Sequence, residues 1–229
     1  MRRSLPFLPI FLLILLGSWS LMAAALAEGE LWNALPHSEQ RELLEGKVVK
    51  LEEDVDGSAW PRFIIYHLVK SPPAAVAAVF WNCELDPKYI PSCTSVKILN
   101  SPEPGVVNAQ YTLSMPFFLP DEVYVSRNKL RKLSPSGYEI SWRVPPSRYS
   151  KSSVGSLRVE EHGDRTLIRY TNLVIPSSRF ASLLRSTAAT QVVESVKALV
   201  AQVISEIEQT PTLLEKQLQA LEQSSGKSQ

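Results

Sequence analysis

The chain has 229 residues, of which 45% are hydrophobic and 21% charged. This composition is typical of one globular domain with a real core, and it excludes a disordered chain or a protein with several membrane spans. The chain has 24 Lys and Arg against 23 Asp and Glu. It therefore lacks the excess of basic residues typical of a nucleic-acid-binding protein, and this class is excluded. The nine glycines include no Gly-x-Gly, which excludes the dinucleotide fingerprint and the P-loop. We therefore expect no nucleotide cofactor.

The first 27 residues are predicted to be a signal peptide. Two arginines precede an apolar run over residues 5–16 and a small-x-small cleavage pattern at residues 25–27. An uncleaved membrane anchor is the alternative, because the segment is just long enough to cross a bilayer of ~30 Å. Cleavage would leave an exported chain that begins near Glu28, either periplasmic or secreted.

The next part of the chain predicts a hairpin followed by a helical insert. The predicted elements are a short helix over 38–45, strands at 47–51 and 62–69, a helix over 74–81 and a strand at 96–99. Branched and aromatic residues dominate the second strand, and Pro72 and Pro73 suit the first turn of the helix that follows. Pro87 and Pro91 then divide the connection to the last strand into short turns.

Consecutive antiparallel strands are predicted after this insert. They cover residues 106–115, 122–133, 138–144, 152–160 and 166–174, and most are separated by Gly-containing turns. Apolar and polar residues alternate in the first and third of them. One face of the sheet should therefore be apolar and the other polar and exposed to solvent.

A long amphipathic helix is predicted over residues 180–207. Its stripe includes the small Ala188 between the larger Leu184 and Val192, so we expect the middle of the helix to stand off from a curved sheet. Residues 199–207 should pack tightly. Pro211 ends this helix, which divides the chain into a domain at 28–210 and a short helix with a flexible tail at 211–229.

Cys83 and Cys93 are the only cysteines. An oxidising compartment would favour a disulfide between them, while two separate buried thiols are the alternative. No pattern of four ligands is present, so no metal site is expected.

Several local motifs resemble one family. Residues 73–99 are similar to its helix, Asp-x-x-Tyr turn and third strand; residues 115–125 are similar to its proline-aromatic loop before the central strand; and residues 155–170 are similar to its penultimate hairpin. In order, these motifs resemble the START-related lipid-transfer superfamily, also called SRPBCC, over residues 47–208. The Arg that usually follows the loop aspartate is absent after Asp121.

The resemblance implies an α+β helix-grip fold, in which a curved antiparallel sheet wraps around a long C-terminal helix and a short helical insert follows the first hairpin. It also implies that an apolar or amphipathic molecule is held between helix and sheet. The residues expected to line that cavity are Tyr111, Leu113, Met115, Phe117, Phe118, Arg127, Trp142, Leu184, Ala188 and Val192. The apolar residues 117–119 suggest either a cavity gate with transient membrane contact or a loop tucked over the core.

The first functional hypothesis is an exported, monomeric binding or transfer protein for a lipid or other apolar small molecule. The alternative is a cyclase or dehydratase in which Arg127, Arg143 or Tyr111 positions a polyketide-like substrate in the same cavity. The third hypothesis is a fully packed domain without a cavity that serves as a protein interaction module. Hydrolase and zinc-protease signatures are absent from the sequence, so no catalytic residue is assigned.

Overall fold

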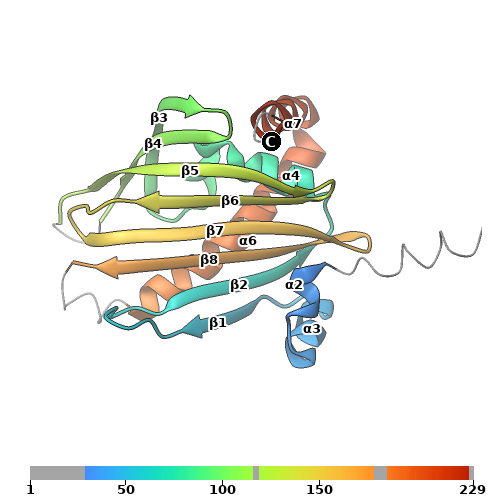
Figure 1. Cartoon of the computed structure of the whole chain (residues 1–229), viewed down its shortest axis with the longest axis horizontal. Coiled ribbons are helices and arrows are strands. Elements are labelled where there is room, and N and C mark those ends of the chain that lie inside the picture. The colour runs from blue at the N-terminus through green and yellow to red at the C-terminus, as the bar shows by residue number, and fades with distance from the viewer. Residues whose placement is uncertain (1–28, 116–118, 178–184, 227–229) are drawn as a thin grey trace, which may run out of the picture.

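The computed structural model describes residues 29–115, 119–177 and 185–226 (Figure 1). The predicted signal peptide therefore lies outside the described residues, as do Phe117, Phe118 and Leu184. Within the described part, no helix combines the length and the apolar character needed to cross a bilayer.

Eight antiparallel strands form one sheet in the order β1-β2-β8-β7-β6-β5-β4-β3. The strands are β1 (Val49–Glu53), β2 (Arg62–Val69), β3 (Cys93–Glu103), β4 (Val106–Leu113), β5 (Glu122–Ser134), β6 (Gly137–Val144), β7 (Ser150–His162) and β8 (Arg165–Pro176). The first hairpin joins the last strand through β2 and β8, so the two ends of the domain meet inside the sheet. Strands 3 to 8 follow one another as a meander.

Helices cover one face of this sheet. They are α4 (Pro73–Trp81), the 3₁₀ turn η2 (Cys83–Leu85), α5 (Asp86–Tyr89), α6 (Arg185–Gln209) and α7 (Pro211–Ser225). In Figure 1, α6 crosses behind the strands. We call the side toward α4 and α6 the inner face and the opposite side the outer face. This arrangement confirms the predicted α+β helix-grip fold with a helical insert after the first hairpin.

Two short helices, α2 (Glu30–Asn33) and α3 (His37–Leu44), cover the outer face at β1, β2 and the adjoining ends of β7 and β8. Trp32 and Leu43 pack there on outward-facing Ile64 and Tyr66. This explains why β2 is apolar at nearly every position, because both of its faces are covered.

The helix after Pro211 is longer than the short helix and flexible tail that were predicted for residues 211–229. Pro211 occupies the first turn of α7, where its missing N–H costs nothing, and the helix continues for 15 residues. Leu221 is fully buried in the same core cluster as α4. The α7 helix is thus an integral layer that packs beside α4.

The apolar stripe of α6 was only partly predicted. Val196, Leu199 and Val203 are buried as expected, whereas Ile204 and Ile207 are 39% and 37% exposed. The tight packing expected throughout residues 199–207 is therefore wrong for these two isoleucines, because they lie on a part of the helix surface that no described element covers.

Candidate functional site

Aromatic side chains gather on the inner face where the helical insert meets the sheet. Phe80 of α4 lies 6.4 Å from Tyr89, 5.8 Å from Trp142 and 6.4 Å from Tyr170, measured between ring centroids. Trp142 and Tyr170 are 5.2 Å apart. We call these four residues the aromatic cluster. Phe80, Trp142 and Tyr170 pack against the core cluster but remain half-buried, so part of their surface is still exposed although α6 crosses this face.

A glycine shapes the cluster. Gly155 of β7 lies directly opposite Trp142 of β6, and a Cβ atom at this position would overlap the indole ring and the Thr171 carbonyl oxygen. The indole therefore lies flat on the backbone of β7. Glycine is required here because the ring approaches the strand so closely.

A buried hydrogen-bond network joins the insert to β4. Asp86, 5% exposed, accepts a hydrogen bond from Tyr89 and another from the Tyr111 hydroxyl at 2.6 Å. Burial raises the pKa of Asp86 from its ordinary value near 3.8 to about 7, against the lowering effect of the two tyrosine hydroxyls. Burial together with the Asp86 charge raises the pKa of Tyr111 well above its ordinary value. The ring of Tyr111 also stacks on Tyr124 at 5.3 Å.

The network continues from Cys83 into β5. The Asn128 amide donates to Cys83 Sγ at 3.4 Å, and the Ser126 hydroxyl donates to Asn128 Oδ1 at 2.8 Å. Ser126 and Asn128 are both buried on the inner face. These partners satisfy polar groups that would otherwise be costly in an apolar interior.

Cys83 and Cys93 are free thiols in the structure, which corrects the prediction of a disulfide. Cys83 Sγ donates to the Trp81 carbonyl oxygen and Cys93 Sγ to that of Ser95, so the two side chains serve separate local contacts within one core cluster. Burial raises the pKa of Cys83 to about 12 and that of Cys93 to about 11. Neither thiol is therefore a reactive thiolate near neutral pH.

The inner face also carries polar atoms without a partner. Among the described residues, Glu122 Oε2, Asn172 Oδ1 and His67 Nδ1 are buried and make no hydrogen bond. Burial is the main cause that lowers the pKa of His67, and the charge of Lys197 adds to it. His67 therefore lies on the inner face, toward α6.

The predicted cavity residues fall into three groups. Tyr111, Leu113 and Trp142 project from the inner face, and Ala188 and Val192 lie half-buried on α6. Met115 is half-buried just beyond β4. Phe117, Phe118 and Leu184 lie outside the described residues.

Arg127 does not line the inner face, and this prediction is wrong. The arginine lies on the outer face, where its guanidinium bonds Glu103 at 2.7 Å and both side chains are more than half exposed. Arg143, directly opposite it, is exposed on the same face. Neither residue can position a substrate between sheet and helix.

Sequence reasoning missed most of the aromatic cluster. Tyr89 was visible in the Asp-x-x-Tyr turn, and Tyr170 shares its face with Ile168 by strand alternation. Phe80 lies in the helix predicted over residues 74–81, and no functional role was predicted for it. Their convergence depends on how α4 and α5 lie against β6 and β8, which local periodicity does not determine.

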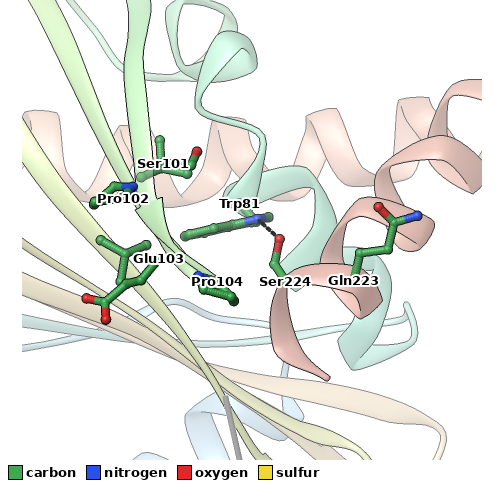
Figure 2. A pocket seen from close by; sticks show the side chains of 10 residues that line it. Trp81, Ser101, Pro102, Glu103, Pro104, Gln223 and Ser224 are labelled. Atoms are coloured by element: carbon green, nitrogen blue, oxygen red, sulfur yellow. Dashed lines mark hydrogen bonds between the residues drawn. The ribbon is translucent and has the colours of Figure 1, made fainter. Parts of the chain in front are cut away.

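A second, separate hollow lies at the end of the sheet between the β3–β4 hairpin and the end of α7 (Figure 2). Its volume is about 380 Å³, and it is lined by the Trp81 indole, which donates to the Ser224 hydroxyl at 3.3 Å. Pro102 and Pro104 of the β3–β4 hairpin also line it. None of the predicted cavity residues lines it, so it is distinct from the aromatic cluster.

No family model and no curated protein matches the sequence. Solved structures do match the fold. A STAR-related lipid transfer protein from Xanthomonas axonopodis aligns with a TM-score of 0.61 and 15% identity, covering 69% of this chain and 94% of the other. Human STARD10 aligns at 0.59 with 11% identity, covering 81% and 85%. The Zhui aromatase/cyclase from a Streptomyces species aligns at 0.55 with 14% identity, covering 65% and 96%.

The chain has the START-related helix-grip fold. Identities of 11–15% establish the START-related architecture alone, because one fold hosts many functions. The function must be argued from the inner face itself.

Proposed function

We propose that this START-related domain is a binding or transfer protein that holds a lipid or other apolar small molecule between its inner face and α6. The observation that carries the proposal is the half-buried state of Phe80, Trp142 and Tyr170 on a face that a long helix crosses. A closed core would bury such rings completely. An apolar ligand lying against them would complete that burial.

Three aromatic side chains of the inner face, two of them in the aromatic cluster, carry polar groups that suit an amphipathic ligand. The Trp142 indole N–H and the hydroxyls of Tyr124 and Tyr170 bond no other described residue. Each can therefore orient a ligand group without leaving a protein partner unsatisfied. Binding needs little more than this, since each buried methylene contributes about 0.8 kcal/mol.

The lipid-transfer proteins among the structural neighbours support this choice of ligand class. We further propose that the chain acts as an exported monomer after removal of residues 1–27. N-terminal sequencing of the protein from its native host tests the export, and a first residue near Glu28 is expected.

Mass spectrometry of solvent extracts from gently purified protein tests the ligand proposal. A lipid or other apolar compound should be present in substoichiometric or higher amount, and Trp142→Ala should reduce it. The control is Leu44→Ala, a 55% exposed position of α3 away from both the inner face and β5, which should leave the amount unchanged. Protein that is always empty and takes up no fatty acid, lysolipid or sterol would contradict the proposal.

A cyclase or dehydratase is the second candidate, favoured by the carboxyl of Asp86, whose pKa is raised to about 7, and by the Zhui aromatase/cyclase among the neighbours. Both Asp86 oxygens are occupied by tyrosine hydroxyls, so a substrate would exchange protons through Tyr111 rather than with the carboxyl itself. Turnover of a polyketide-like substrate that Tyr111→Phe abolishes without loss of fold would favour this candidate over simple binding.

A further inference from the structure

The outer face of β5 changes character along its length. Val123 and Val125 are 51% and 38% exposed, and the next outward positions are the exposed cations Arg127, Lys129 and Arg131. Alternate residues of a strand lie about 7 Å apart. The strand thus presents an apolar section and, directly beyond it, a basic section.

The apolar section is larger than the two valines. Leu119, just before the strand, is 39% exposed. Isolated exposed apolar residues are ordinary, but three that succeed one another at the end of a sheet form a patch. The patch exists because β5 turns Ser126 and Asn128 inward and its valines outward, the reverse of the usual preference for burial.

The basic section is broader than one strand. Arg143 of β6 lies directly opposite Arg127, an arrangement of like charges that weakens a sheet unless a counter-charge is present. Lys97 of β3 lies on the same face, in register with Gln110 of β4, which in turn faces Val125.

The charges on this face do not cancel. On the part of this face formed by β3 to β6, five cations, Lys97, Arg127, Lys129, Arg131 and Arg143, stand against the carboxylates of Glu103 and Glu139, which pair with Arg127 and Arg131. Three cations are left without an ion pair among the described residues. Asp121, next to the apolar section, is exposed and reduces the local excess by one.

We infer that this outer face of β5 and its neighbours docks on an anionic membrane surface. The apolar section Leu119, Val123 and Val125 enters the boundary between head groups and acyl chains, while Arg143, Lys129 and Lys97 meet the lipid phosphates. Charge complementarity selects a lipid surface here, because the cations follow the apolar patch in the order in which a bilayer presents phosphates above its hydrocarbon. The inference concerns the outer face, so it stands or falls independently of what the inner face binds.

Vesicle binding of the full chain tests this inference. Vesicles that contain phosphatidylglycerol should bind more protein than pure phosphatidylcholine vesicles, and added salt should reduce the difference. Each outer-face cation removed should weaken binding about fivefold, so Lys129→Ser with Arg143→Ser should weaken it clearly. Lys216→Ser on α7 is the control and should have no such effect. Equal binding of all these proteins to both kinds of vesicle would overturn the inference.

A local probe separates this face from the apolar N-terminal segment, which can bind lipid by itself. Val123→Cys and, as control, Leu213→Cys on α7 are exposed positions of similar hydrophobicity, and the native thiols are buried. An environment-sensitive dye at position 123 should shift to shorter wavelength on anionic vesicles, whereas the dye at position 213 should not. No shift at position 123, or a shift caused by self-association without vesicles, would overturn the inference.

Discussion

Two halves of the inner face differ in how completely α6 covers them. One stripe of the helix runs through residues 188, 192, 196, 199 and 203. Val196, Leu199 and Val203 are at most 1% exposed, while Ala188 and Val192 remain half-buried. The same helix face therefore closes a core at its C-terminal half and is less completely covered at its N-terminal half.

The sheet shows the same division. Leu130, Leu157 and Ile168 are at most 1% exposed and share a cluster with Leu199 and Val203. Trp142 and Tyr170, on the same face, stay half-buried and have unbonded polar tips. From this difference we expect the closed half to determine stability and the open half to contact the ligand.

Truncation in the closed half should have the largest effect on folding. Leu130→Ala removes a fully buried side chain and leaves a cavity, so it should lower the free energy of unfolding by about 2–5 kcal/mol. Val123→Ala, on the exposed side of the same strand, should change it by no more than about 0.5 kcal/mol. Urea unfolding compares them, and equal losses in both variants would break the proposed division.

The Asp86 carboxyl should make stability depend on pH. The folded state retains a proton that the unfolded chain has lost between pH 3.8 and about 7, so stability should fall as pH rises through this window and level off above it. The full effect is on the order of 4 kcal/mol. Asp86→Asn should flatten this dependence, whereas Asp164→Asn at an exposed turn should not. Parallel pH profiles for the wild type and Asp86→Asn would refute the assignment.

Gly155 tests the border between the halves. In Gly155→Ala the new methyl group would overlap the Trp142 ring and force it off β7, at a cost of about 1–3 kcal/mol. Ligand uptake should change too, because the ring moves within the aromatic cluster. Ser153→Ala, on the same face of β7, is the control and should be nearly neutral in thermal unfolding and in uptake. Indistinguishable melting of the two variants would show that the ring can move freely.

Local patterns in the sequence predicted the fold well. Turn residues and hydrophobic alternation located all eight strands, and the 3.6-residue period located α6. The prediction that Arg127 of β5 lines the cavity was wrong, because Arg127 lies on the outer face together with Val123 and Val125. The structure buries Ser126 and Asn128 instead, because Cys83 of the insert bonds Asn128. That contact joins residues 45 positions apart, and no local pattern contains it.

The site was predicted only where it follows strand alternation. Tyr111 and Trp142 lie on the expected face, whereas Arg127 lies on the opposite one. The free state of Cys83 and Cys93 likewise depends on where η2 and the start of β3 place their side chains. The predicted signal peptide implies an oxidising compartment that would favour a disulfide, but the geometry of the two side chains decides it.

The smallest effect on stability and the most selective effect on binding are expected at Ala188. This residue is half-buried on the less covered half of α6. If the ligand lies beneath this half, as we propose, the ring of Ala188→Trp enters the ligand space without displacing packed neighbours. Stability should change by less than about 1 kcal/mol, because overpacking costs arise only in filled cores. Lipid uptake should fall, because the ring occupies volume that the ligand needs.

Val203→Trp is the matched control, because Val203 lies on the same stripe of α6 in the closed half. This variant should destabilise the fold by at least about 1–3 kcal/mol. Thermal melts run beside uptake assays separate these outcomes: a strongly destabilised Ala188→Trp protein, or one that binds lipid as the wild type does, would show that no ligand space lies beneath the first half of α6.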